Sequence, residues 1–256
     1  MRSLATILLF FALFSASADA SDRTREKRWA DEILPQLVVG DAVWLKHPAG
    51  DFLGLLTEAK GATTAIVLAH GVGVHPDHGL MGPLRTRLAD AGFTTLSIQM
   101  PIAAAEARLE DYHPKLFPLA GERLAVAGEH LRSKGYRRVV LLAHSMGAWM
   151  ANVYLDQAES APYAAWVTLG VTGRYTTRLF AMNLPMLRVN LPLLDVYGSE
   201  DDRPGVVASA GARTSSLADI AGSRQVKIDG ADHFFARKEG EVVRVVADWL
   251  KSLPAQ

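Results

Sequence analysis

A serine between small residues, where a strand gives way to a helix, constrains this fold more than any other feature. Residues 138–142 are apolar and predict a buried parallel strand, whereas residues 148–155 predict a helix. The turn between them carries Ser145, with Ala143 and Gly147 two positions before and after it. Small residues are needed there because larger side chains would meet the neighbouring strand or helix. The pattern predicts a nucleophile elbow, with alanine in place of the commoner first glycine.

Strand and helix patterns alternate along most of the chain. Strands are predicted at residues 42–47, 52–57, 64–69, 94–99, 138–142, 164–169, 192–197 and 225–228, and helices at 79–91, 119–134, 147–157, 205–221 and 239–253. The first two strands flank a turn and favour an antiparallel hairpin. The later alternation predicts an α/β fold, with about eight strands in a mostly parallel sheet and helices on both faces. Residues 21–38 are expected to be helical or loose, and residues 171–190 irregular.

The first 20 residues have the three parts of a secretory signal peptide. Arg2 gives a positive start, residues 4–14 an apolar core, and Ala18-Asp19-Ala20 an A-x-A cleavage site. A membrane anchor is disfavoured, because the apolar run is shorter than the roughly 20 residues that span a bilayer. We expect cleavage near Ala20, a periplasmic or secreted protein, and a single domain over residues 21–256.

The composition excludes several classes of function. The chain has no cysteine, so a disulfide, a thiolate nucleophile and a cysteine-bound metal are all impossible. Lysine and arginine together number 27, as do aspartate and glutamate. This balance gives no global field that would attract nucleic acid or an anionic membrane. We therefore expect a small-molecule partner, no nucleic acid and no membrane span after signal cleavage, and the oligomeric state stays open.

A serine nucleophile requires a base, and the base requires an acid that orients it. On a fold of this kind the acid and then a histidine follow the serine along the chain, each just after a strand. The segment 230–234, Gly-Ala-Asp-His-Phe, follows the last predicted strand. It offers His233 as the base.

The acid is expected in the segment 198–202, Gly-Ser-Glu-Asp-Asp, which follows another predicted strand. Asp201 is preferred, because the usual pattern places aspartate three positions after the glycine. Asp202 and Glu200 stay open as alternatives, since one residue of loop register decides between them. Asp195 lies inside the strand and is a weaker candidate.

A negatively charged oxygen that develops during acyl transfer needs two preorganised donors. One is expected from the N–H of Met146, directly after the serine and at a helix N-terminus. The other is expected from Val72, in the His-Gly-Val-Gly loop at residues 70–73 that follows the first parallel strand. His70 is expected to shape this loop.

A second polar group, His75-Pro76-Asp77-His78, resembles a metal cluster. Two histidines three residues apart would suit a metal on a helix, but the proline and the loop position argue against that geometry. We favour a polar loop and helix cap, and we expect neither a metal nor a cofactor. A weaker expectation is an apolar cleft lined by Trp149, Phe180, Met182, Leu184, Met186, Phe234 and Phe235.

Taken together, these segments resemble the alpha/beta-hydrolase superfamily, and more narrowly a proteobacterial family of unknown function within it. The resemblance runs from about Val43 to Leu250. The segments that carry it, beside the elbow, are His70-Gly71, His75-Pro76-Asp77, Gly79 to Arg85, Leu96 to Pro101, Leu194 to Gly198 and Gly230 to Phe235. It implies the fold and a Ser-Asp-His triad, and it supplies no substrate.

Three hypotheses follow. The first is a secreted serine hydrolase that cleaves carboxylic esters, with thioesters and acyl-lipids as further candidates, through Ser145, Asp201, His233 and an acyl-enzyme. An acyltransferase would use the same machinery. The second is a non-catalytic ligand-binding protein that keeps the fold, and the third is a metal-dependent enzyme. Substrate contacts are expected from the two irregular stretches beside the site, residues 102–118 and 171–190, the second of which carries Arg174, Arg178 and Arg188.

Overall fold

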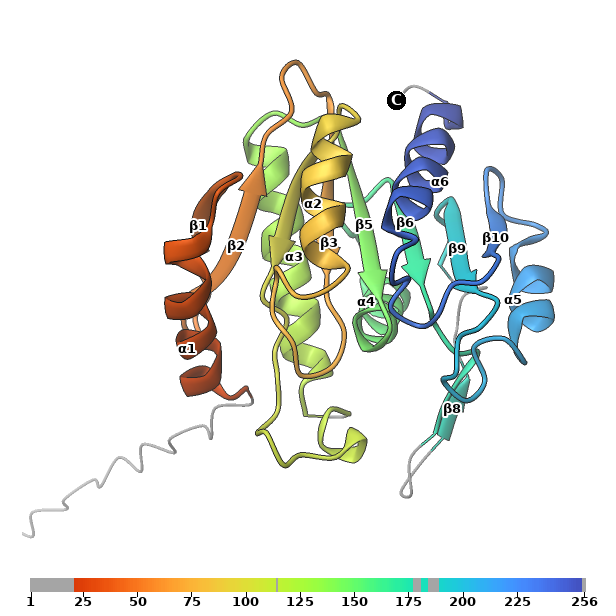
Figure 1. Ribbon diagram of the computed structural model, residues 1–256, viewed down its shortest axis with the longest axis horizontal. Helices are drawn as coiled ribbons and strands as arrows, with labels where there is room; N and C mark the ends of the chain where they lie inside the picture. The colour runs from red at the N-terminus through yellow and green to blue at the C-terminus, as the bar shows by residue number, and fades with distance from the viewer. Residues whose placement is uncertain (1–20, 114, 177–180, 184–188, 255–256) are drawn as a thin grey trace, which may run out of the picture.

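The computed structural model describes residues 21–113, 115–176, 181–183 and 189–254 (Figure 1). The predicted signal peptide lies outside them. The helices are α1 (Arg23–Ile33), α2 (Met81–Asp90), α3 (Phe117–Ser133), α4 (Met146–Gln157), α5 (Ala210–Leu217) and α6 (Glu239–Ser252), with short 3-10 helices at Leu34–Gln36 and Leu109–Asp111. The strands are β1 (Asp41–Leu45), β2 (Phe52–Thr57), β3 (Thr64–Ala69), β4 (Thr94–Ile98), β5 (Arg138–His144), β6 (Ala165–Leu169), β7 (Arg174–Thr176), β8 (Ala181–Asn183), β9 (Leu193–Gly198) and β10 (Arg224–Ile228). Among the described residues, no helix is both long and apolar enough to cross a membrane.

Eight of these strands form one sheet, in the order β1-β2-β4-β3-β5-β6-β9-β10. Strand β2 runs antiparallel to both β1 and β4. All the other neighbouring pairs are parallel. The predicted α/β architecture is therefore confirmed: an antiparallel hairpin at the front leads into a mostly parallel sheet. The carboxyl ends of β5, β9 and β10, which precede the candidate site residues, point to the same edge of the sheet.

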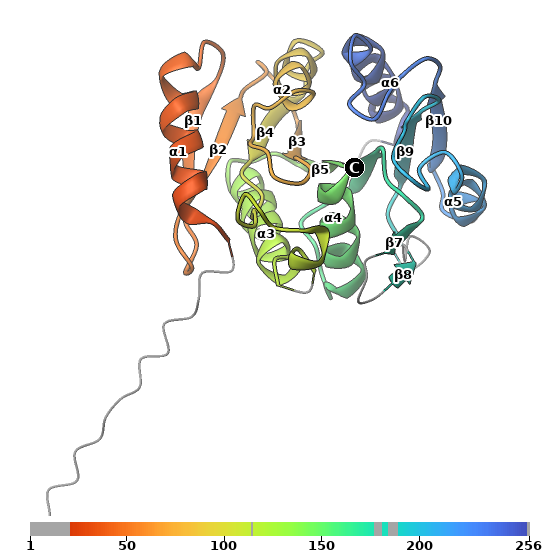
Figure 2. The ribbon, with the colours of Figure 1, turned by 60° about the horizontal axis from the view of Figure 1, so that its bottom comes forward.

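Helices cover both faces of the sheet, with α3 and α4 on one face and α2 and α6 on the other (Figure 2). Strand β5 shows how its sequence serves both layers, because successive side chains of a strand point to opposite faces. Val139 and Leu141 pack into the cluster that contains α3 and α4 residues, whereas Val140 and Leu142 pack into the cluster of α2 and α6. A strand buried on both faces requires a continuous apolar run, which is the pattern that predicts it.

The segment at residues 171–190 departs from the irregular structure predicted for it. Strands β7 and β8 pair there as a short antiparallel hairpin that stands outside the main sheet. Tyr175, in the middle of β7, is buried, and the two residues beside it are exposed. Three-residue strands are too short to give a recognisable alternation, so their sequence carries little signal.

Helix α5 is shorter than the helix predicted over residues 205–221. The expected first turn is a loop instead, in which Gly205 has a φ of 90° that a right-handed helix excludes. The Ser209 side chain accepts a hydrogen bond from the N–H of Gly173 at 2.8 Å. This contact ties the loop before α5 to the loop that leads into β7.

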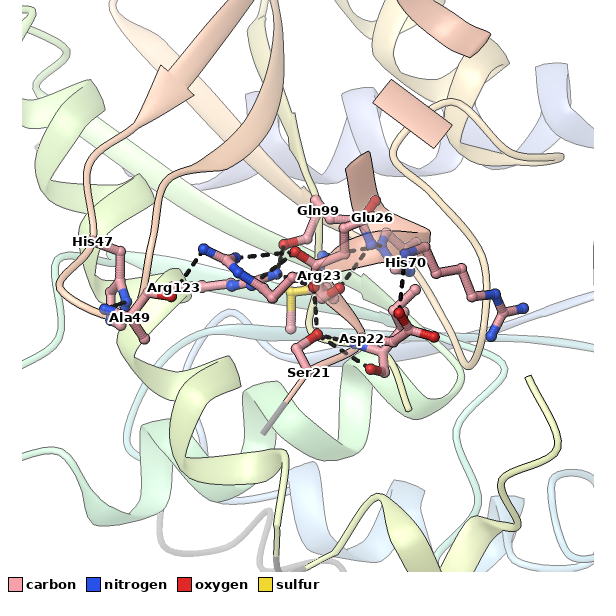
Figure 3. Close-up of polar contacts among 12 residues, drawn as sticks. Ser21, Asp22, Arg23, Glu26, His47, Ala49, His70, Gln99 and Arg123 are labelled. Carbon is pink, nitrogen blue, oxygen red and sulfur yellow. Dashed lines mark hydrogen bonds and ion pairs between the residues drawn. The ribbon is translucent and has the colours of Figure 1, made fainter. Parts of the chain in front are cut away.

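Helix α1, predicted as helical or loose, is anchored by a buried ion pair (Figure 3). Asp22 caps the helix by accepting a hydrogen bond from the N–H of Arg25. Glu26, in the first turn, accepts two hydrogen bonds from Arg123 of α3, at 2.9 and 3.0 Å. Arg123 is fully buried and also donates to the Gln99 carbonyl at 2.9 Å. The pair therefore joins α1, α3 and the end of β4.

We expect Glu26→Gln to lower the free energy of unfolding by about 3 kcal/mol, because removing one partner of a buried ion pair leaves the other charge uncompensated. Urea denaturation measures the effect. Asp31→Asn is the matched control on the same helix, since Asp31 pairs with Lys27 on the surface at 2.6 Å. That change is expected to cost less than about 1 kcal/mol. Equal losses in the two variants would contradict a special role for the buried pair.

Candidate active site

Ser145 lies at the turn between β5 and α4, where the elbow pattern places it. Its backbone has φ 54° and ψ −120°, a region that residues with a side chain rarely adopt. The N–H of Ser145 donates to the Leu169 carbonyl at 2.9 Å. Gly147 shows why the turn needs small residues, because a Cβ there would lie 2.4 Å from the His70 carbonyl oxygen. Close packing of α4 against the end of β3 thus fixes the strained conformation of the serine.

The structure brings Ser145, His233 and Asp201 together in one hydrogen-bonded row. The Nε2 atom of His233 lies 2.9 Å from Ser145 Oγ, and its Nδ1 atom lies 2.8 Å from Asp201 Oδ2. His233 and Asp201 are both buried. Gly170 borders the row closely, since a Cβ on it would lie 3.2 Å from His233 Nδ1. Such a row can move a proton from the serine hydroxyl onto the imidazole.

Of the three candidate acids, Asp201 is the one that contacts His233 among the described residues. Asp201 contacts His233 with Oδ2, and its Oδ1 accepts the N–H of Arg203 at 2.9 Å. Asp202 instead points to the surface and lies 3.8 Å from the Arg203 side chain. Among the described residues, Glu200 forms no hydrogen bond or ion pair with His233.

Asp195 is buried inside β9 and belongs to a separate polar cluster. Its carboxylate accepts hydrogen bonds from Thr168 at 2.9 Å, Arg213 at 2.8 Å and Gln225 at 2.7 Å. These contacts join β6, β9, β10 and α5. Asp195 is thus a structural carboxylate, as its position inside the strand indicates.

His144 contacts the backbone of His233, a role that was not predicted from the sequence. Its Nε2 lies 2.9 Å from the His233 carbonyl oxygen, so it carries the hydrogen of that bond. The two rings lie 4.9 Å apart. Burial, reinforced by the nearby His233, lowers the pKa of His144 to about 4. His144 is therefore a neutral donor that holds the backbone of His233 in place.

His70 shapes the loop after β3, as predicted, and Figure 3 shows it beside Gln99. Its Nε2 accepts the N–H of Met100 at 2.9 Å, which leaves Nδ1 to donate to the Gly71 carbonyl at 2.8 Å. Burial lowers the pKa of His70 to about 3. A neutral imidazole with one fixed tautomer thus joins the end of β4 to the loop beside the serine.

These two buried histidines predict a loss of stability in acid. Their folded pKa values of about 3 and 4 lie below the ordinary value of 6.5, so the unfolded chain binds more protons between these limits. As the pH falls below about 6.5, each histidine is expected to lower the free energy of unfolding by up to about 1.4 kcal/mol per pH unit. The contribution of each levels off near its folded pKa.

Thermal unfolding at pH 7 and pH 5 measures this effect, and His144→Gln is expected to reduce the difference between the two conditions. Glutamine keeps an N–H donor for the His233 carbonyl but does not titrate. A variant as sensitive to acid as the parent would contradict the assignment.

The loop after β3 lies against Ser145. A Cβ on Gly71 would come within 3.2 Å of the Ser145 Cβ, so glycine permits this close approach. Val72 and Met146, the predicted oxyanion donors, line the same pocket as Ser145. Met146 is the first residue of α4, where N–H groups have no partner within the helix. The positions of both residues are compatible with the predicted donor role.

Helix α1 holds this loop from outside. The Arg25 guanidinium donates to the carbonyls of Gly73 and Ala103, at 3.2 Å in each case. It also lies over the Trp29 ring, 4.6 Å from its centroid. Arg25 thereby connects the loop after β3 with the loop after β4.

A pocket of about 580 Å³ opens beside the serine. It is lined by Val72, Leu109, Ser145, Met146, Trp149, Gly170, Thr172, Arg174, Tyr175, Thr176, Arg203, Pro204, Gly205 and His233. Leu109, Thr172 and residues 174–176 come from the two segments in which substrate contacts are predicted. Residues 203–205 were not predicted, because only the fold brings the loop after β9 beside β7.

The predicted apolar cleft is found only in part. Trp149 lines the pocket, and Phe234 is half exposed with its ring 5.2 Å from that of His233. Phe235 is fully buried in the core. The remaining predicted positions lie outside the described residues, or have side chains outside them: Arg178, Phe180, Met182, Leu184, Met186 and Arg188.

The candidate metal cluster at residues 75–78 has other partners. Asp77 binds Arg85 of α2 at 2.6 Å, and the His75 ring packs against Trp29. Within the part of the chain that the structure describes, no three histidine, aspartate or glutamate side chains are grouped as a metal ion would require. The contacts are those of a polar loop packed against α1 and α2.

Known proteins were compared with the chain by family profile, by sequence and by structure. Residues 6–116 match the profile of a family described as a protein of unknown function (DUF3530). A comparison with curated protein sequences gives no match.

Solved structures resemble the chain over most of its length. Dienelactone hydrolase from Anabaena variabilis is 22% identical with a TM-score of 0.65, and the alignment covers 84% of this chain and 98% of that one. XC6422 from Xanthomonas campestris, described as an a/b serine hydrolase without lid, is 15% identical with a TM-score of 0.63 over 86% and 98% of the two chains. Est1E from Butyrivibrio proteoclasticus is 13% identical with a TM-score of 0.62 over 82% and 97%.

Proposed function

The chain has the alpha/beta-hydrolase fold, and from this premise we propose that it is a serine hydrolase that cleaves carboxylic esters. The observation that carries the proposal is the row Ser145–His233–Asp201, with 2.9 and 2.8 Å between successive partners. A binding protein has no need of a serine, a histidine and an aspartate in this geometry. A metal-dependent enzyme is not favoured by the contacts of residues 75–78.

In the proposed mechanism, Ser145 Oγ attacks the ester carbonyl while its proton passes to His233 Nε2. Asp201 accepts the Nδ1–H of His233 and stabilises the imidazolium. The N–H groups of Met146 and Val72 bind the oxyanion of the tetrahedral intermediate. His233 then gives its proton to the leaving alcohol, which leaves an acyl-enzyme.

Water completes the reaction. His233 takes a proton from the attacking water, a second tetrahedral intermediate forms at the acyl carbon, and its collapse releases the carboxylic acid. The proton on His233 returns to Ser145 Oγ, so the enzyme ends each cycle unchanged. Thioesters and acyl-lipids are chemically compatible with the same steps.

We further propose that residues 1–20 are removed as a signal peptide near Ala20 and that the mature chain, a single domain over residues 21–256, acts in the periplasm or outside the cell. The support is the sequence pattern alone. Mass spectrometry of the exported protein gives the new N-terminus directly.

Two measurements on the mature protein test the enzymatic proposal: hydrolysis of p-nitrophenyl esters of graded chain length, and labelling by a fluorophosphonate, which reacts with activated serines. We expect turnover of at least the short esters, and a label that peptide mapping places on Ser145. A folded protein with neither turnover nor label would overturn the proposal.

A further inference from the structure

The charged side chains that line the pocket beside Ser145 are all basic among the described residues. Its described lining includes two arginines, Arg174 and Arg203, and no aspartate or glutamate. The chain as a whole has equal numbers of basic and acidic residues, so this local excess is a property of the site. Asp201, two residues before Arg203, does not line the pocket; it is buried and bonded to His233.

The two arginines come from segments that pack against each other. A Cβ on Gly205 would lie 3.9 Å from the Thr172 side chain, and the N–H of Gly173 donates to Ser209 at 2.8 Å. The loop after β9, which carries Arg203, therefore adjoins the start of β7, which carries Arg174. Both cations belong to one side of the pocket.

Neither guanidinium is held by a strong ion pair. Arg203 lies 3.8 Å from Asp202 at the surface, where both side chains are more than half exposed, and such pairs contribute little. Arg174 forms no ion pair with any of the residues that the structure describes. Both groups are thus available to an anion that enters the pocket.

The rest of the pocket is apolar and aromatic. Trp149 and Tyr175 line it with their rings 5.5 Å apart, and Val72 and Leu109 line it with side chains that are 40% and 48% exposed. Apolar groups of this kind, beside two cations, fit a ligand that is apolar at one end and negatively charged at the other.

We propose that the natural substrate is an anionic ester, in which an oxyanion group such as a free carboxylate is bound by Arg174 and Arg203 and the apolar part by Trp149 and Tyr175. This proposal rests on the serine hydrolase function proposed above and narrows its substrate class. The arginines act in binding, because a guanidinium matches the two oxygens of a carboxylate.

The test compares mono-p-nitrophenyl glutarate with its neutral methyl ester, after subtraction of the uncatalysed rate of each. The two have the same acyl chain and leaving group and differ by one charge. We expect the anionic ester to have the higher kcat/KM by about tenfold, which is the effect of one charge-assisted contact. The preference is expected to shrink as salt is added, because these arginines are exposed.

Arg174→Gln and Arg203→Gln are each expected to lower kcat/KM for the anionic ester several-fold, and the double variant is expected to remove the preference. Turnover of the neutral ester is expected to fall by a smaller factor than that of the anionic ester, so that the ratio of the two kcat/KM values carries the result. Arg244→Gln is the matched control, since Arg244 is an exposed arginine on α6 that pairs with Asp248 and does not line the pocket.

The outcomes separate the two proposals. A parent enzyme that favours the neutral ester, or a double variant that keeps the full preference, would overturn the anionic substrate and leave the serine hydrolase intact. If neither ester is cleaved and the fluorophosphonate does not label Ser145, the serine hydrolase itself is wrong.

Discussion

Replacing Ser145 by alanine is expected to lower kcat for ester hydrolysis by at least about 10⁴-fold, because the acyl-enzyme no longer forms and only the oxyanion donors and substrate binding remain. The fold should survive. Alanine differs from serine only by the hydroxyl, so the positive φ of 54° is no more strained than before, and stability should stay within about 1 kcal/mol.

The measurement is the initial rate with p-nitrophenyl butyrate, with circular dichroism to confirm that the variant is folded. Ser215→Ala serves as the control, since Ser215 is exposed on α5 and bonded to the Gly211 carbonyl. It is expected to retain full activity. Activity that persists in a folded Ser145→Ala protein would remove Ser145 as the nucleophile.

The second large effect concerns the acid. Asp201→Asn is expected to lower kcat by about 10⁴-fold, because an amide nitrogen that faces His233 Nδ1 favours the wrong tautomer and cannot stabilise the imidazolium. Asp202→Asn is expected to change kcat less than about twofold, since its carboxylate is screened at the surface. Because the two residues are adjacent, each is the matched control for the other.

Steady-state kinetics on both variants measures the contrast. A large loss in Asp202→Asn with little loss in Asp201→Asn would reverse the assignment made from the 2.8 Å contact. Equal losses would indicate that the conformation of the loop, rather than one carboxylate, limits the reaction.

The centre of the sheet was predictable from the sequence because its strands, among them β3, β5 and β6, are buried on both faces. Strand β3 was predicted with the bounds it has, and β5 and β6 differ from their predicted bounds by at most two residues. A run such as Thr64–Ala69 has no polar interruption, so no other structure competes for it. Ser145 and His233 were predictable because each follows a strand on a fold with a known order of site residues.

The features of the site that could not be predicted from the sequence depend on contacts between residues far apart in the chain. The choice between Asp201 and Asp202 depends on one residue of loop register, which only packing decides. The contact of His144 with the His233 carbonyl joins residues 89 positions apart, and the Glu26–Arg123 pair spans 97. No local pattern signals either one. For the same reason, the sequence did not predict that Arg203 lines the pocket.

Strand β10 lies at one edge of the sheet, and this position affects the order in which the parts of the site unfold. Edge strands open before central ones, because they are bonded to a neighbour on one side only. His233 follows β10, whereas Ser145 follows β5 in the middle of the sheet. Under mild denaturation we therefore expect His233 to move out of the site while Ser145 keeps its position. Turnover would then be lost through an early, local unfolding of β10, well before the Trp166 side chain in β6 became exposed to solvent.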